Sequence, residues 1–293
     1  RPWQSTQDTR LVAPFSLQLE HELNEGRLEA AKRFAAVNDL NKITVSGADD
    51  RLGIVAAGKT YYDLREALHM LGLDDEALNR YGIRLLKIGM LYPMEPEIVR
   101  RFARGLQEIL VIEEKRAFME VFLRDILYNQ SERPSIIGKR DEQDQPLVRS
   151  DSELDVDQVM RLLGKRLRDC VPSDLLDSRL ADLCAASVSM EVPLVGSQSA
   201  TANRNPYFCS GCPHNRSTVL PDGSIAGGGI GCHGMVLSMD RNHEGITHMG
   251  GEGVQWVGAA PFSNTPHIFQ NMGDGKLAHS GYLAIRQAIA AGT

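Results

Sequence analysis

The spacing of apolar residues divides the chain into a helical lead-in, a repeated strand–helix pattern and a glycine-rich final section. Between residues 17 and 37 apolar residues recur at helical spacing, and Gly26 interrupts them, so two short helices are predicted. From residue 43 to about 129, short apolar runs alternate with helical patterns. The predicted strands are Leu52–Ala57, Ile83–Met90 and Glu108–Glu113, and the predicted helices are Tyr62–Leu71, Glu97–Arg104 and Phe118–Tyr128.

The alternating pattern indicates the fold class and the domain organisation. Strands that are apolar throughout and joined by helices are typical of a parallel sheet covered on both faces. A polar stretch from Asn129 to Asp157 indicates a surface loop, a helix is predicted over Val156–Cys170, and Val192–Asn205 is loop-like again. We therefore expect a helical lead-in over residues 1–47, an α/β domain over 48–150, a helical and loop linker over 151–205, and a second domain over 206–293.

Composition and charge exclude several classes of protein. Hydrophobic residues make up 42% of the 293 residues, enough to build cores, so a disordered chain is excluded. No apolar run reaches the roughly 18 residues of a membrane span, and the net charge of −6 argues against a general nucleic-acid binder. Five cysteines and no signal peptide after Arg1 favour a reduced, cytoplasmic setting, with Cys170 and Cys184 as packing residues.

A cluster of cysteine and histidine residues carries the most specific motif. Cys209-Ser-Gly-Cys212-Pro-His214 is followed by Gly229-Ile-Gly-Cys232-His233. Two thiolates at this spacing can bind one metal centre, and a third cysteine can complete one face of it. A cubane iron–sulfur cluster takes four cysteines, of which three are present here, whereas zinc can use the three with one histidine. The remaining interpretation is that these cysteines lie in loops and bind nothing.

A second motif is Asn271-Met-Gly-Asp274-Gly-Lys276, which lies between an apolar lead-in and an apolar helical pattern. This is a strand–turn–helix context. Glycines let the backbone approach a diphosphate, and a helix start offers free N–H groups to an anion. An aspartate beside them can hold the Mg²⁺ that bridges the phosphates. By itself, Gly-Asp-Gly is also compatible with an ordinary turn.

Two further features leave alternatives open. His248-Met-Gly-Gly-Glu252-Gly-Val-Gln-Trp256 either lines a pocket or is a glycine-rich turn with Glu252 in solvent. Glu113 and Glu114 end the third predicted strand and either face an interface or are simply exposed.

The order of these motifs resembles one family. Cys-x-Gly-Cys-Pro-His, Gly-Ile-Gly-Cys, Met-Gly-Gly and Gly-Asp-Gly with His279-Ser-Gly resemble the thiamine-diphosphate domain of the indolepyruvate ferredoxin oxidoreductases, within the 2-oxoacid:ferredoxin oxidoreductases. Gly53-Ile-Val-Ala-Ala-Gly-Lys-Thr-Tyr, Leu86-Lys-Ile-Gly-Met-Leu-Tyr-Pro and Leu110-Val-Ile-Glu-Glu resemble the transketolase C-terminal-like domain that precedes it. The resemblance covers roughly residues 40 to 293 and is nearest to the fused form of the enzyme.

The resemblance implies a fold, a reaction and partners. The fold is α/β, with two three-layer parallel-sheet domains, the second being the first part of a thiamine-diphosphate-binding domain. The reaction is the oxidative decarboxylation of an aryl pyruvate, with indolepyruvate expected, to acyl-CoA, CO₂ and reduced ferredoxin. Its cofactors are thiamine diphosphate, Mg²⁺ and, where the cysteines hold one, a [4Fe–4S] cluster. The partners are the 2-oxoacid, coenzyme A, ferredoxin, the remaining domains and a second copy of the chain in a homo-oligomer.

The resemblance also assigns roles to residues. It makes Asp274 the Mg²⁺ ligand, with Gly273 and Gly275 beside the diphosphate. It makes Cys209, Cys212 and Cys232 ligands of the iron–sulfur cluster. It also places Cys232 and His233 near the thiazolium and His214 next to the cofactor. His233 is the one residue considered for a catalytic role. A second Mg²⁺-binding Asn and a fourth cluster Cys would fall beyond Thr293. We therefore expect a fragment that is inactive alone. The alternative is a zinc-ribbon-like binding or structural module without catalysis.

Overall fold

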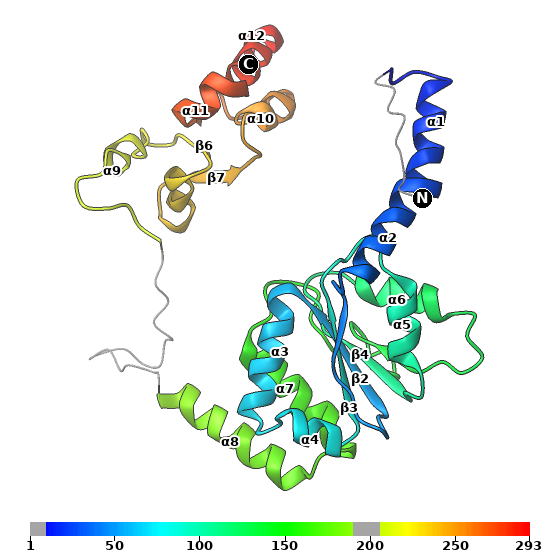
Figure 1. The fold of residues 1–293 in the computed structure, drawn as a ribbon. Coiled ribbons are helices and arrows are strands. Elements are labelled where there is room, and N and C mark those ends of the chain that lie inside the picture. Colours follow the sequence, from blue (N-terminus) through cyan, green and yellow to red (C-terminus); the bar gives the residue numbers. More distant parts are fainter. Residues whose placement is uncertain (1–9, 190–205) are drawn as a thin grey trace. The chain divides into compact units, whose positions relative to one another are not determined.

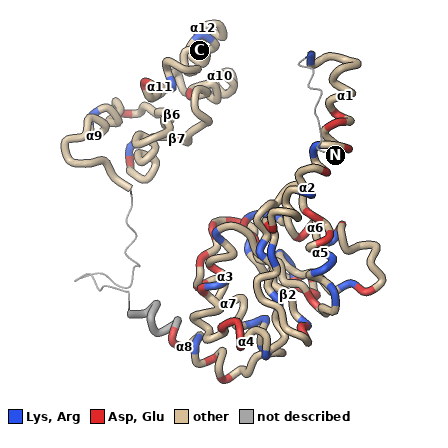
Figure 2. The backbone as a smooth tube through the Cα atoms, in the orientation of Figure 1, with Lys and Arg blue, Asp and Glu red and all other residues tan. Residues whose placement is uncertain are grey.

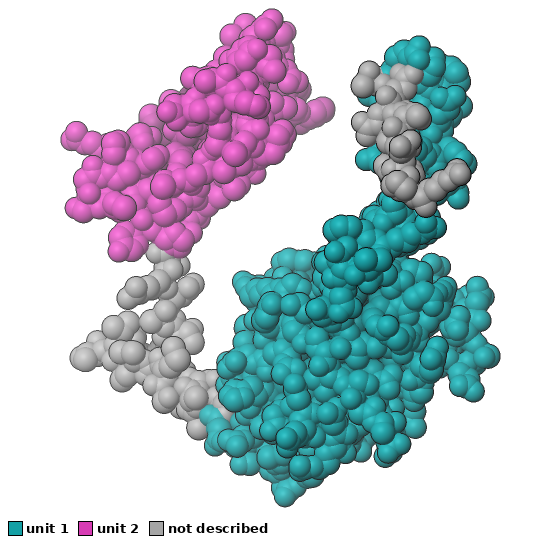
Figure 3. Space-filling model, viewed as in Figure 1, with its two compact units in different colours: residues 1–191 teal, residues 192–293 magenta. Residues whose placement is uncertain are grey.

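The chain folds as two units, which we describe separately. The computed structural model describes the backbone of residues 10–189 and 206–293, and their side chains except for those of residues 183–189. The first unit spans residues 1–191 and the second spans residues 192–293 (Figure 3). The loop predicted over Val192–Asn205 and the side chain of Cys184 lie outside the described residues.

The first unit is built on a five-stranded sheet in the order β1-β3-β2-β4-β5 (Figure 1). β2 (Leu52–Ala57) lies at the centre and pairs in parallel with β3 (Ile83–Ile88) and β4 (Glu108–Val111). The three predicted strands and their parallel arrangement are therefore confirmed. Two short edge strands were not predicted, namely antiparallel β1 (Lys42–Val45) and parallel β5 (Ser135–Ile137). Their few residues mix polar and apolar side chains and give little periodic signal.

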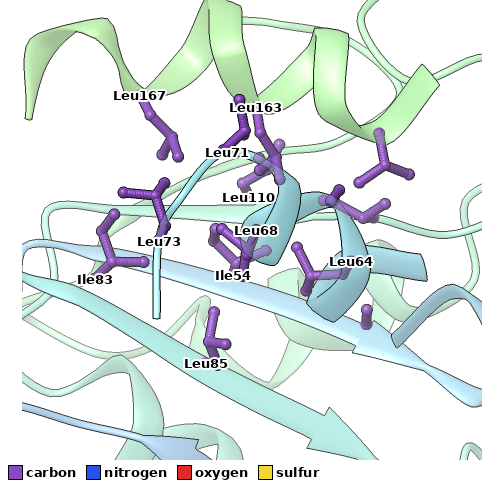
Figure 4. Close-up of a cluster of buried hydrophobic side chains, with 14 of the residues drawn as sticks. Ile54, Leu64, Leu68, Leu71, Leu73, Ile83, Leu85, Leu110, Leu163 and Leu167 are labelled. Atoms are coloured by element: carbon purple, nitrogen blue, oxygen red, sulfur yellow. The ribbon is translucent and has the colours of Figure 1, made fainter. Parts of the chain in front are cut away.

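Helices cover both faces of this sheet, as predicted for a three-layer α/β domain. α3 (Gly58–Met70), α4 (Asp75–Arg80) and α7 (Val156–Arg166) contribute to one buried cluster. α5 (Pro96–Ala103) and α6 (Met119–Leu127) contribute to a second cluster with other residues of the same strands. Figure 4 shows the first cluster, in which Leu64 and Leu68 of α3 lie among sheet residues and residues of α7.

Part of the segment predicted as a linker packs into the first unit. α7 buries Val159, Met160 and Leu163 and packs against α3. Asp155 begins the helix, because its side chain accepts a hydrogen bond from the Gln158 N–H at 2.7 Å. α8 (Ser173–Ser189) follows and packs against α7. The apolar stripe of α7 therefore covers the sheet domain rather than connecting two domains.

Glu113 is a buried cap rather than an exposed or interface residue. Its side chain is 7% exposed and accepts hydrogen bonds from the backbone N–H groups of Phe118, Met119 and Glu120, at 3.1, 2.8 and 3.2 Å. These groups lie at the start of α6, where the first N–H groups of a helix have no partner within the helix. Both interpretations considered for Glu113 are therefore wrong.

The lead-in is one continuous helical segment with an irregular turn, where two short helices were predicted. α1 (Phe15–Glu22) runs through a π-helical turn (Leu23–Arg27) into α2 (Leu28–Val37) (Figure 1). Gly26 lies inside the π turn. A glycine is tolerated within a helix, and here the irregularity is absorbed by wider hydrogen bonding instead of a break.

The second unit contains a small parallel sheet in the order β7-β6-β8. Its strands are β6 (Ala226–Gly228), β7 (His243–Ile246) and β8 (Phe269–Gln270). A 3₁₀ segment, η3 (Cys232–Ser238), follows β6, and α10 (Val254–Ala259) packs against α12 (Tyr282–Ala291). The connections from β6 to β7 and from β7 to β8 run in opposite directions across the sheet.

Among the described residues, no helix is both long enough and apolar enough to cross a bilayer.

Candidate functional site

The candidate site lies at the carboxyl edge of the small sheet, where the segments after β6 and β8 meet. These strands are neighbours, yet the chain leaves β6 in one direction and arrives at β8 from the other. In open parallel sheets ligands bind at such a point of reversal. The two loops are in close contact, because a Cβ on Gly229 would lie 2.8 Å from the Asn271 carbonyl oxygen. Glycine at position 229 therefore sets how closely the loops approach.

Asp274 lies at this edge with its side chain in solvent. It is the first residue of a short helical turn, α11 (Asp274–Lys276), which follows β8 directly and continues through a π turn (Leu277–Gly281) into α12. The strand–turn–helix context predicted for Gly-Asp-Gly is therefore confirmed. Asp274 and Gly275 are exposed, and a Cβ on Gly275 would meet nothing within 4 Å. An exposed carboxylate between two glycines has the donor chemistry and the open space that Mg²⁺ and a diphosphate need.

Lys276 connects this turn to the other two strand ends. Its ammonium donates a hydrogen bond to the Ile230 carbonyl after β6. It also lies 3.9 Å from the Glu252 carboxylate, which belongs to the segment after β7. The two side chains are 14% and 0% exposed, so the ion pair is shielded from water. Charged residues are sparse in this unit (Figure 2), and Lys276 is the only lysine between residues 192 and 293.

Glu252 is buried, which excludes the interpretation that it is a solvated residue of a glycine-rich turn. Its residue exposure is 2%. One carboxylate oxygen accepts a hydrogen bond from the Gly250 N–H at 2.7 Å, and the other has no hydrogen-bond partner. A buried carboxylate is costly unless it is paired, so Lys276 is its compensating charge.

The structure brings part of the cysteine–histidine motif together. Cys209 and Cys212 share a turn closed by a 3.0 Å backbone hydrogen bond, and the Cys212 Sγ lies 3.2 Å from the His214 Nδ1. The His214 ring stacks on Phe208 and lies 5.8 Å, centroid to centroid, from the His233 ring. Cys209 and Cys232 are exposed. Over residues 10–189 and 206–293, no group of three or more His, Cys, Asp or Glu side chains is arranged to hold a metal ion.

His233 is buried and held in its neutral form. Its Nδ1 accepts a hydrogen bond from the Gly229 N–H at 3.0 Å, which places the ring proton on Nε2. Burial first, and then the charges of His243, His214 and Lys276, lower the pKa of His233 from 6.5 to about 4. The buried Nε2 has no hydrogen-bond partner among the described residues.

The low pKa of His233 predicts acid sensitivity of the second unit. The unfolded chain binds a proton at His233 below about pH 6.5, but the folded chain does so only near pH 4. The free energy of unfolding therefore keeps its full contribution from His233 above pH 6.5. It decreases as the pH falls toward 4, by on the order of 2 kcal/mol. Urea unfolding between pH 4 and 8 measures this loss. His233→Asn should flatten the profile in this range, and an unchanged profile would contradict the assignment.

A cavity of about 890 Å³ lies in the first unit, at the amino edge of its sheet. Arg166 lines it and pairs with Glu108 and Glu142 at 2.8 and 2.6 Å. Arg166 lowers the pKa of Glu142 to about 2. This cavity contains none of the site residues predicted from the sequence.

A mostly parallel sheet, a small parallel sheet and a carboxyl-edge site with an exposed aspartate define an α/β protein with a candidate anion and metal site. The family model described as "Indolepyruvate oxidoreductase domain" matches residues 42–189, half of the chain. The chain therefore belongs to the indolepyruvate oxidoreductase family.

Relatives extend this similarity across both units. The chain is 25% identical over 294 residues to indolepyruvate oxidoreductase subunit IorA of Methanothermobacter thermautotrophicus, covering 94% of this chain and 41% of that protein. It is 22% identical over 295 residues to IorA of Archaeoglobus fulgidus, covering 98% and 42%. The chain thus spans about two fifths of the length of these relatives. Among solved structures, 2-oxoglutarate:ferredoxin oxidoreductase from Magnetococcus marinus matches with a TM-score of 0.35 and 14% identity, covering 52% of this chain and 23% of that one.

Sequence patterns located Asp274 and its glycines but not the Lys276–Glu252 pair. Lys276 ends the Gly-Asp-Gly motif and Glu252 lies in another motif, and neither was given a role. The isolation of Lys276 as the only lysine of its unit was the available signal.

Proposed function

We propose that this chain is the part of a thiamine-diphosphate-dependent 2-oxoacid:ferredoxin oxidoreductase that holds the diphosphate end of the cofactor and its Mg²⁺. The substrate in this proposal is indolepyruvate. It loses CO₂, the acyl group that remains passes to coenzyme A, and ferredoxin takes the electrons. The observation that carries the proposal is an exposed aspartate between two glycines at the carboxyl edge of a parallel sheet, in a chain of the indolepyruvate oxidoreductase family.

The residues around the sheet edge suit this role. Asp274 would supply a carboxylate to Mg²⁺, and Gly273 and Gly275 would let the diphosphate approach the backbone. Cys232 and His233 follow the neighbouring strand, so we propose that they face the thiazolium, with His214 next to them. When bound, thiamine diphosphate supplies the carbanion chemistry, and these side chains orient it and limit access of water.

The remaining parts of the proposal concern the cysteines and the partners. We propose Cys209, Cys212 and Cys232 as ligands of an iron–sulfur cluster, which would need a fourth ligand besides these three. The name IorA denotes a subunit in the relatives, which supports partner polypeptides for this chain as well. A homo-oligomer and a cytoplasmic setting complete the proposal, and the 293-residue chain alone is expected to be inactive.

The experiment that tests the proposal measures thiamine-dependent reduction of ferredoxin. The complete protein, purified without oxygen, is mixed with indolepyruvate, coenzyme A and ferredoxin, with and without thiamine diphosphate. We expect reduction only with thiamine diphosphate, and a rate no higher than the thiamine-free control would count against the proposal. Metal analysis of the same sample separates the alternative, since one zinc per chain without iron or sulfide would favour a zinc-binding module.

A further inference from the structure

The Lys276 ammonium lies between the glycines of two loops at the candidate site. A Cβ on Gly273 would lie 3.8 Å from its Nζ, and a Cβ on Gly231 would lie 4.0 Å from the same atom. The side-chain stem therefore folds back over the Gly-Asp-Gly turn toward the loop after β6. The ammonium therefore lies beside glycines of both loops.

Two partners hold this ammonium in place, and one of them, Glu252, is buried. The Ile230 carbonyl accepts one of its N–H groups, and the Glu252 carboxylate faces it at 3.9 Å. The second oxygen of Glu252 accepts a backbone N–H, while the oxygen facing Lys276 has no hydrogen-bond partner. An ammonium has three N–H donors, and among the described residues only the Ile230 carbonyl accepts one of them, so donors remain for a ligand.

The charges around the Lys276 ammonium favour an anion as its ligand. Lys276 is the only lysine in the second unit, and it comes from the turn that carries Asp274. A metal ion at Asp274 and the ammonium of Lys276 would together present positive charge at the carboxyl edge of the sheet. A diphosphate, which carries several negative charges, is the group that needs both.

We propose that Lys276 is a diphosphate ligand, held by the Ile230 carbonyl and the charge of Glu252, that donates an N–H group to a phosphate oxygen of the cofactor. This inference rests on the proposed function and adds a specific residue to it. Lys276 also joins the ends of all three parallel strands, so a bound diphosphate is expected to stiffen the three loops together.

The test compares Lys276→Met with Lys276→Arg and with Arg286→Met in the complete protein. Arg286 is an exposed residue of α12, so its replacement removes one positive charge from the same helical run at a residue with no proposed ligand contact. Calorimetric titration gives the dissociation constants of Mg²⁺–thiamine diphosphate, Mg²⁺–pyrophosphate and unphosphorylated thiamine. We expect Lys276→Met to weaken the two diphosphate ligands between about 10-fold and 100-fold. Lys276→Arg and Arg286→Met should change these dissociation constants little. Lys276→Met should likewise change the dissociation constant of unphosphorylated thiamine little.

The outcomes separate this inference from the proposed function. If the unsubstituted protein binds both diphosphate ligands and Lys276→Met binds them equally well, the role of Lys276 is wrong and the proposed function stands. If the unsubstituted protein binds neither ligand, the proposed function fails and this inference fails with it.

A second measurement needs no substitution and covers the case in which Lys276→Met does not fold. The rate at which an acetylating reagent modifies Lys276 is followed by mass spectrometry in the unsubstituted protein. Mg²⁺–pyrophosphate should slow the reaction at Lys276 several-fold, and an unchanged rate with pyrophosphate bound would overturn the inference.

Discussion

Replacing Asp274 by Asn is expected to lower thiamine-dependent ferredoxin reduction at least about 100-fold. Asparagine keeps the size of the side chain but removes the negative charge that a divalent cation needs. Loss of even an indirect partner of a bound metal costs roughly 10-fold to 100-fold, and Asp274 is proposed as a direct ligand. The apparent affinity for Mg²⁺ should fall with the rate. The measurements are ferredoxin reduction against Mg²⁺ concentration and calorimetric titration with Mg²⁺–thiamine diphosphate.

Asp240→Asn is the matched control for this prediction. Asp240 is also an exposed aspartate of the second unit, it lies shortly before β7, and it has no proposed role in cofactor binding. It should keep the rate and the Mg²⁺ dependence of the unsubstituted protein. If Asp274→Asn also kept both, the Mg²⁺ site would have to be moved elsewhere.

Replacing Asp50 by Ala is expected to destabilise the first unit by about 3–5 kcal/mol. The Asp50 side chain is fully buried and accepts a hydrogen bond from the Arg84 Nε at 2.8 Å, as well as from Ser46 and the Gly47 N–H. Arg84 is 11% exposed, so alanine at position 50 would leave a buried guanidinium without a counter-charge. Urea unfolding of the two proteins, followed by circular dichroism, measures the difference in free energy.

Two further variants test the cause of that loss. Asp49 is the exposed neighbour of Asp50, and Asp49→Ala should stay within roughly 0.5 kcal/mol of the unsubstituted protein. The double variant Asp50→Ala with Arg84→Met should lose less free energy of unfolding than the sum of the losses in the two single variants, because the double variant has no uncompensated charge. Strictly additive effects would show that the pair is not coupled.

The central part of the fold was predictable because its signals are local. β2 and β4 are largely apolar and buried on both faces, and β3 is apolar and buried apart from Arg84 and Lys87, so these strands stand out in a sequence. The start of α3 was predicted four residues late, at Tyr62, because Lys59 and Thr60 give its first turn a polar appearance. The packing of α7 against α3 could not be predicted, since helical spacing shows that a face is apolar but not what covers it.

The candidate site was predictable only where one short segment makes it. Gly273, Asp274 and Gly275 are consecutive, and their strand–turn–helix context is visible in the sequence. The ion pair of Lys276 with Glu252 joins two loops 24 positions apart, and the contact between His214 and His233 joins two others. These contacts depend on how separate segments pack together, which residue spacing does not specify.

The most direct test of the central claim is the position of the metal in a structure of the complete protein with thiamine diphosphate. Mn²⁺ in place of Mg²⁺ can be located by its anomalous scattering. The account predicts one Mn²⁺ peak within about 2.2 Å of an Asp274 carboxylate oxygen, with the diphosphate over Gly273 and Gly275. Thiamine diphosphate bound with its metal away from Asp274 would contradict the account.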